Sequence, residues 1–252
     1  MLLVRRIIPA CVFTVSLVSF WMLLTYPGQF WTVLAVSAVS LSLLLWSLLK
    51  PLPAIEMAHH ILLVVLFFLG ALLYVSFNAM DAWGYGAALL ISLLVGFFVE
   101  NLFLYVWNPG AYEPYSIEYF SRVLQYGSVF LYSAFLFFMN MAGISLFAVV
   151  LGGTLAAILA AASFFTMQKF EAGVVRPLLF LTLVLFGQIF SVISLFPFDP
   201  TVSALLLTIV FYLFTGLLRH RFRNMTSSSR VQGYFVFSLA SMALVMLTAR
   251  WR

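Results

Sequence analysis

The sequence predicts an all-α protein of the polytopic integral membrane class, a bundle of about nine transmembrane helices. Of its 252 residues, 65% are hydrophobic and only 8% are charged, whereas a soluble domain has about 25% charged residues. The apolar residues form runs of about twenty, the length that a helix needs to cross a hydrocarbon core of about 30 Å. In lipid such runs must be helical, because each backbone N–H and C=O has to be satisfied within its own segment. The alternating pattern of a membrane β-barrel is absent.

Nine apolar runs follow one another along the chain, and Gly- and Pro-rich turns separate several of them. No joint between the runs is longer than about fifteen residues, so residues 1–252 are expected to form a single transmembrane domain without a soluble domain. The expected spans are 7–26, 30–49, 61–80, 84–107, 123–141, 143–165, 177–196, 201–219 and 231–248.

Positive charges alternate from one joint to the next. The N-terminus and the even-numbered joints hold ten Lys and Arg residues, and the odd-numbered joints hold none. Because Lys and Arg mark cytoplasmic loops, the N-terminus is expected in the cytoplasm. Nine spans then put the C-terminus outside, although Arg250 and Arg252 would face outward with it. An arrangement with eight spans is the alternative, with one apolar run re-entrant or lying on the surface.

Glu100 is the only carboxylate deep inside an apolar run, the span 84–107. A charged side chain in the bilayer core costs a few kcal/mol, so such residues usually face the helix bundle and often mark function. Glu100 precedes Trp107 by seven residues, or about 10 Å along a helix. Because Trp favours the membrane interface, the carboxyl is expected in the cytoplasmic half of the bilayer.

Four polar residues are candidates for function or for locking helices together. A hydrogen-bonded carboxyl that locks two helices is the favoured interpretation of Glu100, and a proton, cation or catalytic site is the alternative. Gln125 and Tyr126, at the start of the next span, are further expected partners of this carboxyl. The four candidates are Glu100, Asn101, Arg122 and Gln188.

Small residues recur every four positions before Glu100. Helices in lipid associate through close backbone contact across Gly, Ala and Ser, so this stripe predicts a tight helix interface. The span 143–165 offers a complementary small surface, and a ligand groove beside the small residues is the alternative interpretation. The packing residues are Gly84, Ala88, Ser92 and Gly96 in the first span, and Gly153, Ala157 and Ala161 in the second.

All three histidines of the chain are expected at the cytoplasmic surface. Glu56 and His60 are four residues apart, so they share one face of a helix, with His59 beside them. A metal site needs three or four ligands in fixed geometry, and no HExxH pattern is present. Structural roles at the interface are favoured, and no cofactor is expected. A metal site is the weak alternative, with Glu56, His59, His60 and His220 as its candidate ligands.

Two of the joints between spans have a distinctive composition, one aromatic and acidic and the other basic. Tyr and Phe alternate with Glu113 and Glu118 in the joint 108–122, which predicts a short amphipathic segment on the membrane surface. A substrate- or partner-binding cap over Glu100 is the alternative for this joint. The basic eighth joint is expected to attract anionic lipid headgroups, and the net charge of +5 reflects such joints, not binding of nucleic acid. Its basic residues are Arg219, Arg221, Arg223 and Arg230.

The sequence contains no Walker motif, no Rossmann fingerprint and no Ser-His-Asp order. A non-catalytic protein of the plasma membrane is therefore favoured: a subunit of a membrane complex, an assembly factor or a small permease-like carrier. Its expected partners are the lipid bilayer, other membrane proteins or further copies of itself. A secondary transporter that uses Glu100 is one alternative. An enzyme embedded in the membrane that acts on a lipid or a lipid-linked substrate is the other.

Overall fold

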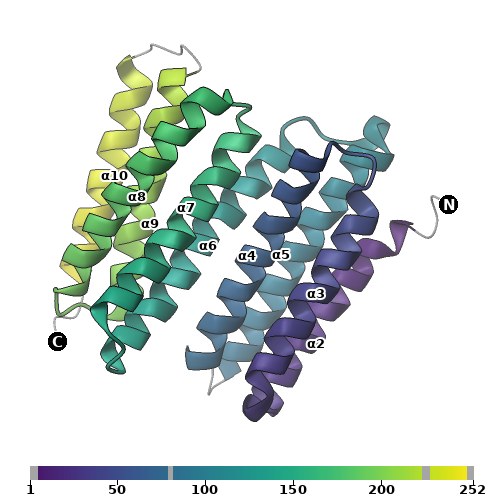
Figure 1. The fold of residues 1–252 in the computed structure, drawn as a ribbon, viewed down its shortest axis with the longest axis horizontal. Helices are drawn as coiled ribbons and strands as arrows, with labels where there is room; N and C mark the ends of the chain where they lie inside the picture. Colours follow the sequence, from purple (N-terminus) through teal and green to yellow (C-terminus); the bar gives the residue numbers. More distant parts are fainter. Residues whose placement is uncertain (1–4, 79–81, 223–227, 249–252) are drawn as a thin grey trace. The chain divides into compact units, whose positions relative to one another are not determined.

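The computed structural model describes residues 5–78, 82–222 and 228–248, and most of them are helical (Figure 1). Two short 3₁₀ turns, η1 (Pro27–Gln29) and η2 (Pro109–Ala111), lie between long helices. The α-helices of the described residues are α2 (Ile8–Thr25), α3 (Phe30–Leu49), α4 (Ala54–Asn78), α5 (Ala82–Trp107), α6 (Ser116–Met141), α7 (Leu146–Met167), α8 (Ala172–Ser194), α9 (Pro200–Phe222) and α10 (Ser228–Thr248).

Eight of the helices in the described ranges, α2 to α9, are long and apolar enough to cross a membrane. The apolar part of α10, Gln232–Thr248, is shorter. The predicted fold class is therefore confirmed: the protein is a polytopic bundle of membrane helices. Both the nine-span and the eight-span arrangements stay open, because they differ only in whether α10 crosses the bilayer.

Two helices begin about two turns earlier than the apolar runs predicted. α4 starts at Ala54 instead of residue 61, and α6 starts at Ser116 instead of residue 123. The aromatic joint 108–122 is therefore not a separate surface segment, because its last seven residues form the first two turns of α6. Polar residues such as Glu56 and Glu118 belong to these first turns, where an acidic side chain is favoured by the helix dipole.

Two helices end in the same hydrogen-bonded motif. After α6, the N–H of Ile144 bonds to the C=O of Met139 (3.0 Å), and Gly143 has a positive φ of 91°. After α7, the N–H of Phe170 bonds to the C=O of Phe165 (3.2 Å), and Lys169 has a φ of 55°. Both are Schellman motifs, which satisfy carbonyl groups that a helix end leaves without partners.

The chain forms two compact units, Met1–Leu124 and Gln125–Arg252, whose boundary lies within α6. In the first unit, α2 packs against α5 and α3, and α4 packs against α3 and α5. Large apolar side chains fill the centre of this unit, and Phe20 of α2 meets Phe68 of α4 edge to face at 5.3 Å between ring centroids. This packing brings the start of α2, the end of α3 and the end of α5 to one end of the unit.

In the second unit, α7 packs closely against α8, and α9 packs against α10. Phe190 of α8 lies in the notch left by Gly153 of α7 and stacks on Phe137 of α6 with 5.4 Å between centroids. Tyr234 of α10 packs in the same manner over Gly216 of α9. Aromatic rings set into glycine notches therefore hold this unit together.

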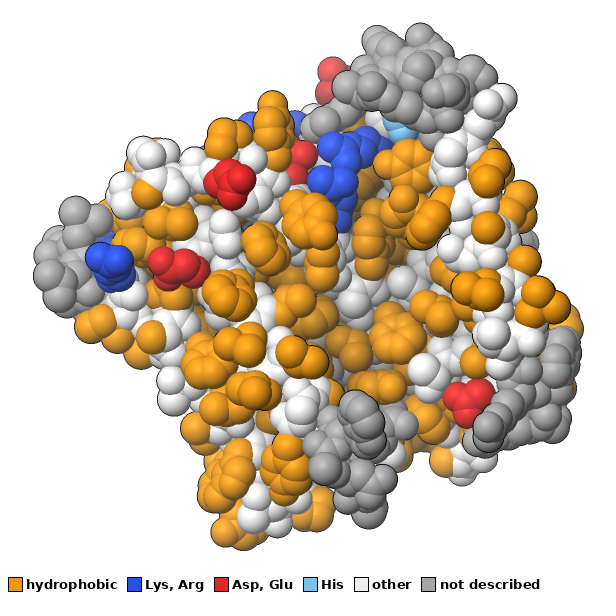
Figure 2. All heavy atoms as spheres, turned by 180° about the vertical axis from the view of Figure 1, so that it is seen from behind, with side chains coloured by type: hydrophobic (Ala, Val, Ile, Leu, Met, Phe, Trp, Pro, Cys, Tyr) orange, Lys and Arg blue, Asp and Glu red, His pale blue; other side chains and the backbone are white. Residues whose placement is uncertain are grey.

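The helices expose large apolar side chains along most of their length. On the face in Figure 2, hydrophobic side chains cover much of the described surface. Phe97 of α5 is 60% exposed and Phe147 of α7 is 77% exposed. A soluble protein rarely exposes such a continuous apolar surface, whereas hydrocarbon chains cover it at no cost. The protein is therefore integral to a membrane.

Candidate functional site around Glu100

Trp107 joins three segments at one end of the first unit. Its indole Nε1 donates a hydrogen bond to the C=O of Leu48 (2.9 Å), in the last turn of α3. Carbonyl groups there have no partner within their own helix, so this bond satisfies a group that would otherwise need water. The guanidinium carbon of Arg5 lies 3.6 Å from the centroid of the Trp107 ring. The indole and the adjacent charges, Arg5 and Lys50, mark this end of the unit as the membrane surface.

Glu100 is a partly buried residue of α5. One turn before it, Gly96 contacts α2, where an added Cβ would lie 3.3 Å from the Cβ of Phe13. Two turns after it, Trp107 contacts Arg5, which precedes α2. Glu100 therefore lies at the edge of the seam between α2 and α5, about 10 Å below the level of Trp107.

Within the described residues, no hydrogen bond or ion pair joins the carboxyl of Glu100 to another side chain. Arg122, an expected partner of Glu100, donates from its Nε to the backbone of its own helix, at the C=O of Glu118 (3.0 Å). Asn101 behaves in the same way, since its side-chain N–H donates to the C=O of Phe97 (2.8 Å). Among the described residues, therefore, no hydrogen bond or ion pair supports the helix-locking role that was favoured for Glu100.

The other expected partners of Glu100 belong to the second unit and have contacts there. Gln125 donates to the hydroxyl of Ser163 (3.3 Å), and the hydroxyls of Tyr126 and Thr215 lie 3.3 Å apart. Gln188 is exposed on α8. Gln125 and Tyr126 connect α6 to α7 and α9 within this unit.

The stripe of small residues before Glu100 contacts α2 at Gly96. Gly84, Ala88 and Ser92 are buried, and Gly96 contacts Phe13 of α2. On α7, Gly153, Ala157 and Ala161 are also buried, but the contact of Gly153 is with α8. Within its own unit, Gly96 thus packs on α2 and Gly153 packs on α8. In each case a phenylalanine from the partner helix lies against a glycine.

The histidines of α4 are buried side by side. His59 is 7% exposed and His60 is 5% exposed, with 5.3 Å between their ring centroids. His60 lies 6.3 Å from the ring of Phe98, and its Nδ1 is buried without a hydrogen-bond partner. His220, in the second unit, packs edge to face on Tyr234 at 5.1 Å. In the part of the chain that the structure describes, no three His, Cys, Asp or Glu side chains are grouped to hold a metal ion.

The basic joint after α9 is only partly described. Arg219 and Arg221 lie in the last turn of α9, where positive charge is favoured by the helix dipole. Arg223 and the side chain of Arg230 lie outside the described residues.

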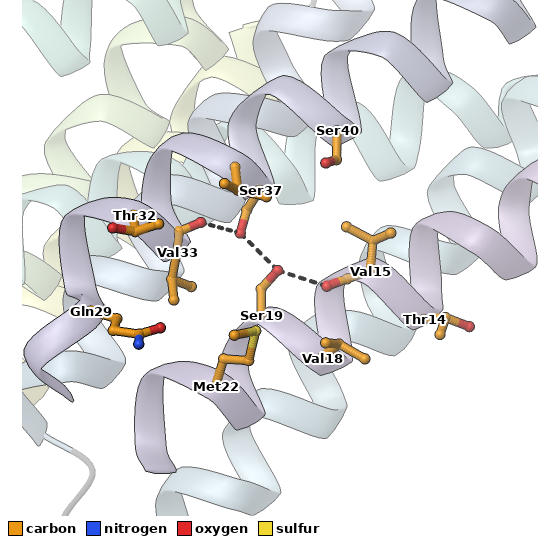
Figure 3. A pocket seen from close by; sticks show the side chains of 11 residues that line it. Thr14, Val15, Val18, Ser19, Met22, Gln29, Thr32, Val33, Ser37 and Ser40 are labelled. Atoms are coloured by element: carbon orange, nitrogen blue, oxygen red, sulfur yellow. Dashed lines mark hydrogen bonds between the residues drawn. The ribbon is translucent and has the colours of Figure 1, made fainter. Parts of the chain in front are cut away.

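A groove between α2 and α3 is the feature that sequence reasoning missed (Figure 3). It has a volume of about 290 Å³, and its floor contains the hydroxyls of Ser19 and Ser37, which lie 2.7 Å apart. Both serines are buried, whereas Val18 and Val36 at the rim are exposed. The pairing could have been found from the sequence, because Ser19 and Ser37 are almost equally far from the turn that joins the two helices.

Three polar side chains that line this groove, Gln29, Thr32 and Ser40, make no hydrogen bond to a described residue. Hydroxyls in membrane helices usually bond to the carbonyl four residues earlier. Thr14 does so with Ala10 (2.9 Å), and Ser42 does so with Ala38 (2.7 Å). The groove therefore combines apolar walls with free hydrogen-bonding groups.

These features define an integral membrane protein built as a polytopic helical bundle. In comparisons with protein-family models, with curated proteins and with solved structures, no match to the chain was found.

Proposed function

We propose that this protein is a non-catalytic, multi-pass protein of the plasma membrane that acts as a subunit or assembly factor of a membrane-protein complex. The observation that carries the proposal is Glu100, an ionisable group within a membrane helix that is partly exposed and bonded to no described residue. A group of this kind needs a partner, and the edge of the α2–α5 seam leaves it accessible from the lipid side.

The energetic argument favours a protein partner. An unpaired charge near the bilayer centre costs about 3 kcal/mol on insertion scales, and the alternative of protonation leaves a neutral carboxyl without hydrogen bonds. A partner helix that offers a Lys, Arg, Asn or Ser beside α5 would recover much of this cost.

Co-purification in mild detergent tests this proposal. The wild-type protein should retain at least one other membrane protein, and Glu100→Gln should reduce its yield by about tenfold, since a charge-assisted hydrogen bond contributes about 1.5–3 kcal/mol. Glu113→Gln is the matched control, because Glu113 is an exposed carboxyl in the joint between α5 and α6. A monodisperse preparation without partners would contradict the proposal, as would equal losses in the two variants.

A small permease-like carrier is the second candidate, and the groove between α2 and α3 favours it. Its apolar walls and its free groups at Gln29, Thr32 and Ser40 suit a small amphiphilic molecule that enters from the bilayer. Glu100 would then be the proton-binding group of a coupled transport cycle. Proton flux into proteoliposomes should fall to the background of empty vesicles in Glu100→Gln. Equal flux in the wild type and this variant would remove the carrier role of Glu100.

A further inference from the structure

We propose that Arg5, held flat against Trp107, binds the phosphate of an anionic phospholipid at the end of the first unit. This proposal is independent of the function assigned to Glu100, because it uses a different side chain and a different ligand. It also differs from the general attraction of lipid expected at the basic end of α9.

The stacking of Arg5 leaves its hydrogen-bond donors available. The guanidinium carbon lies 3.6 Å from the centroid of the Trp107 ring, so the face of the cation is used by the indole. The N–H groups of an arginine point outward in the plane of the guanidinium, at its edges. No hydrogen bond or ion pair connects Arg5 to another described residue. The planar fork of donors therefore matches the oxygens of a phosphate without having to leave an existing partner.

Trp107 itself is fixed, which holds Arg5 in place before any ligand arrives. Its Nε1 donates to the C=O of Leu48 at 2.9 Å, so the indole cannot turn without losing a bond to α3. A side chain that is ordered in advance loses less conformational entropy on binding. The three segments that meet here come from the start of α2, the end of α3 and the end of α5.

The location favours lipid phosphate over soluble phosphate. Tryptophan prefers the headgroup zone, and Lys50, which follows α3, is an exposed second cation at the same end. The alternation of positive charge along the chain predicts that this end faces the cytoplasm, where the leaflet is rich in anionic lipids. The headgroup zone holds phosphate groups at the height of Trp107.

Arg6 provides the matched control for this proposal. It is the next residue and carries the same charge, but it is exposed and no aromatic ring is stacked on it in the described residues. If only simple attraction between a basic end and anionic lipid operates, the two arginines contribute equally to the lipid affinity. If Arg5 belongs to a built phosphate site, Arg5 contributes more to the affinity than Arg6 does.

The experiment is a lipid titration of the purified full-length protein in detergent, with the bound lipid counted by native mass spectrometry. Phosphatidylglycerol should bind more tightly than phosphatidylcholine. Arg5→Gln should weaken phosphatidylglycerol binding by about tenfold or more, as for loss of a charge-assisted hydrogen bond. Arg6→Gln should weaken it by no more than about fivefold, the effect of one surface charge.

Arg5→Lys keeps the positive charge, and it is the variant to test if Arg5→Gln does not give a monodisperse preparation. It should also weaken binding, because lysine lacks the planar fork. Equal losses in Arg5→Gln and Arg6→Gln, or unchanged binding in Arg5→Lys, would refute the built site. Displacement of the lipid by millimolar inorganic phosphate would show that the site takes soluble phosphate, which contradicts the lipid proposal.

Discussion

At the scale of single residues, the polar groups of the membrane helices differ in whether they have a partner. Asn101 and Ser42 bond to carbonyl groups of their own helices, so each costs little in lipid. Glu100 has no such bond among the described residues, and neither has Ser40 in the groove. The unbonded groups are the ones that need a second molecule, which is why the functional proposals rest on them.

Among the described glycines of the second unit, Gly153 has the least room for an added Cβ. A Cβ at this position would lie 2.1 Å from the ring of Phe190. We therefore expect Gly153→Ala to destabilise the protein by about 1–3 kcal/mol through overpacking. Unfolding in mixed detergent micelles measures this change.

Gly86→Ala is the control for Gly153→Ala, because Gly86 of α5 has no atom within 4 Å of an added Cβ. That variant should be neutral or slightly stabilising, since alanine is the better helix former. Adding Phe190→Leu to Gly153→Ala should recover part of the loss, because the smaller side chain makes room for the methyl group. A Gly153→Ala protein as stable as wild type would show that this notch is not tightly filled.

At the scale of helices, the turn between α6 and α7 depends on one backbone conformation. Gly143 has a positive φ of 91°, and nothing lies within 4 Å of a Cβ built there. Gly143→Ala should therefore cost about 1–2 kcal/mol from backbone strain alone, without a clash. Lys169, with a φ of 55° after α7, is the reverse case, so Lys169→Gly should be tolerated or stabilising. Equal effects of the two substitutions on thermal unfolding would contradict this interpretation.

The sequence predicts where the membrane helices lie, but less of where they begin and what they contact. Runs of apolar residues mark the spans because the bilayer fixes their length. α6 begins at Ser116, earlier than its apolar run, because Glu118 and Arg122 occupy the polar end of the helix. A search for apolar runs does not detect a helix end that is made of polar residues. The partner of a small-residue stripe is also hidden, since it depends on where Phe13 and Phe190 project from other helices.

Part of the candidate site was accessible from the sequence alone. Glu100 is visible as an acid in an apolar run, and Trp107 as an interfacial anchor. The stacking of Arg5 on Trp107 was not visible, because it joins positions about one hundred residues apart along the chain. The hydroxyl pair of Ser19 and Ser37 is an intermediate case, because it was missed but could have been predicted from the sequence. Two helices joined by a short turn place residues at equal distances from that turn side by side.

At the scale of the whole molecule, the orientation in the membrane is a prediction from charge. Gly28, in the turn between α2 and α3, should face outside, and Gly110, after α5, should face the cytoplasm. Both positions are exposed, with open space for a side chain. In a Cys11→Ser background, Gly28→Cys should react with an impermeant thiol reagent in sealed cells, and Gly110→Cys should not. The opposite labelling pattern would reverse the orientation.

Thiol labelling in the same Cys11→Ser background also distinguishes the nine-span arrangement from the eight-span arrangement. Thr248 is exposed at the end of α10, so Thr248→Cys should be labelled from outside if α10 crosses the bilayer. Protection from the reagent, with labelling after the cells are opened, would place that end in the cytoplasm and support eight spans.

The most direct measurement of the central claim is photo-cross-linking in cells from a residue next to Glu100. Phe97 is 60% exposed and three residues before Glu100 on α5, so a photoreactive amino acid there would touch any helix docked beside Glu100. The account predicts a discrete cross-link to a membrane protein from position 97, lost in the Glu100→Gln background. Position 180 is the control, because Phe180 is similarly exposed on α8, and it should give no such product. Cross-links to lipid alone from both positions would contradict a partner at Glu100.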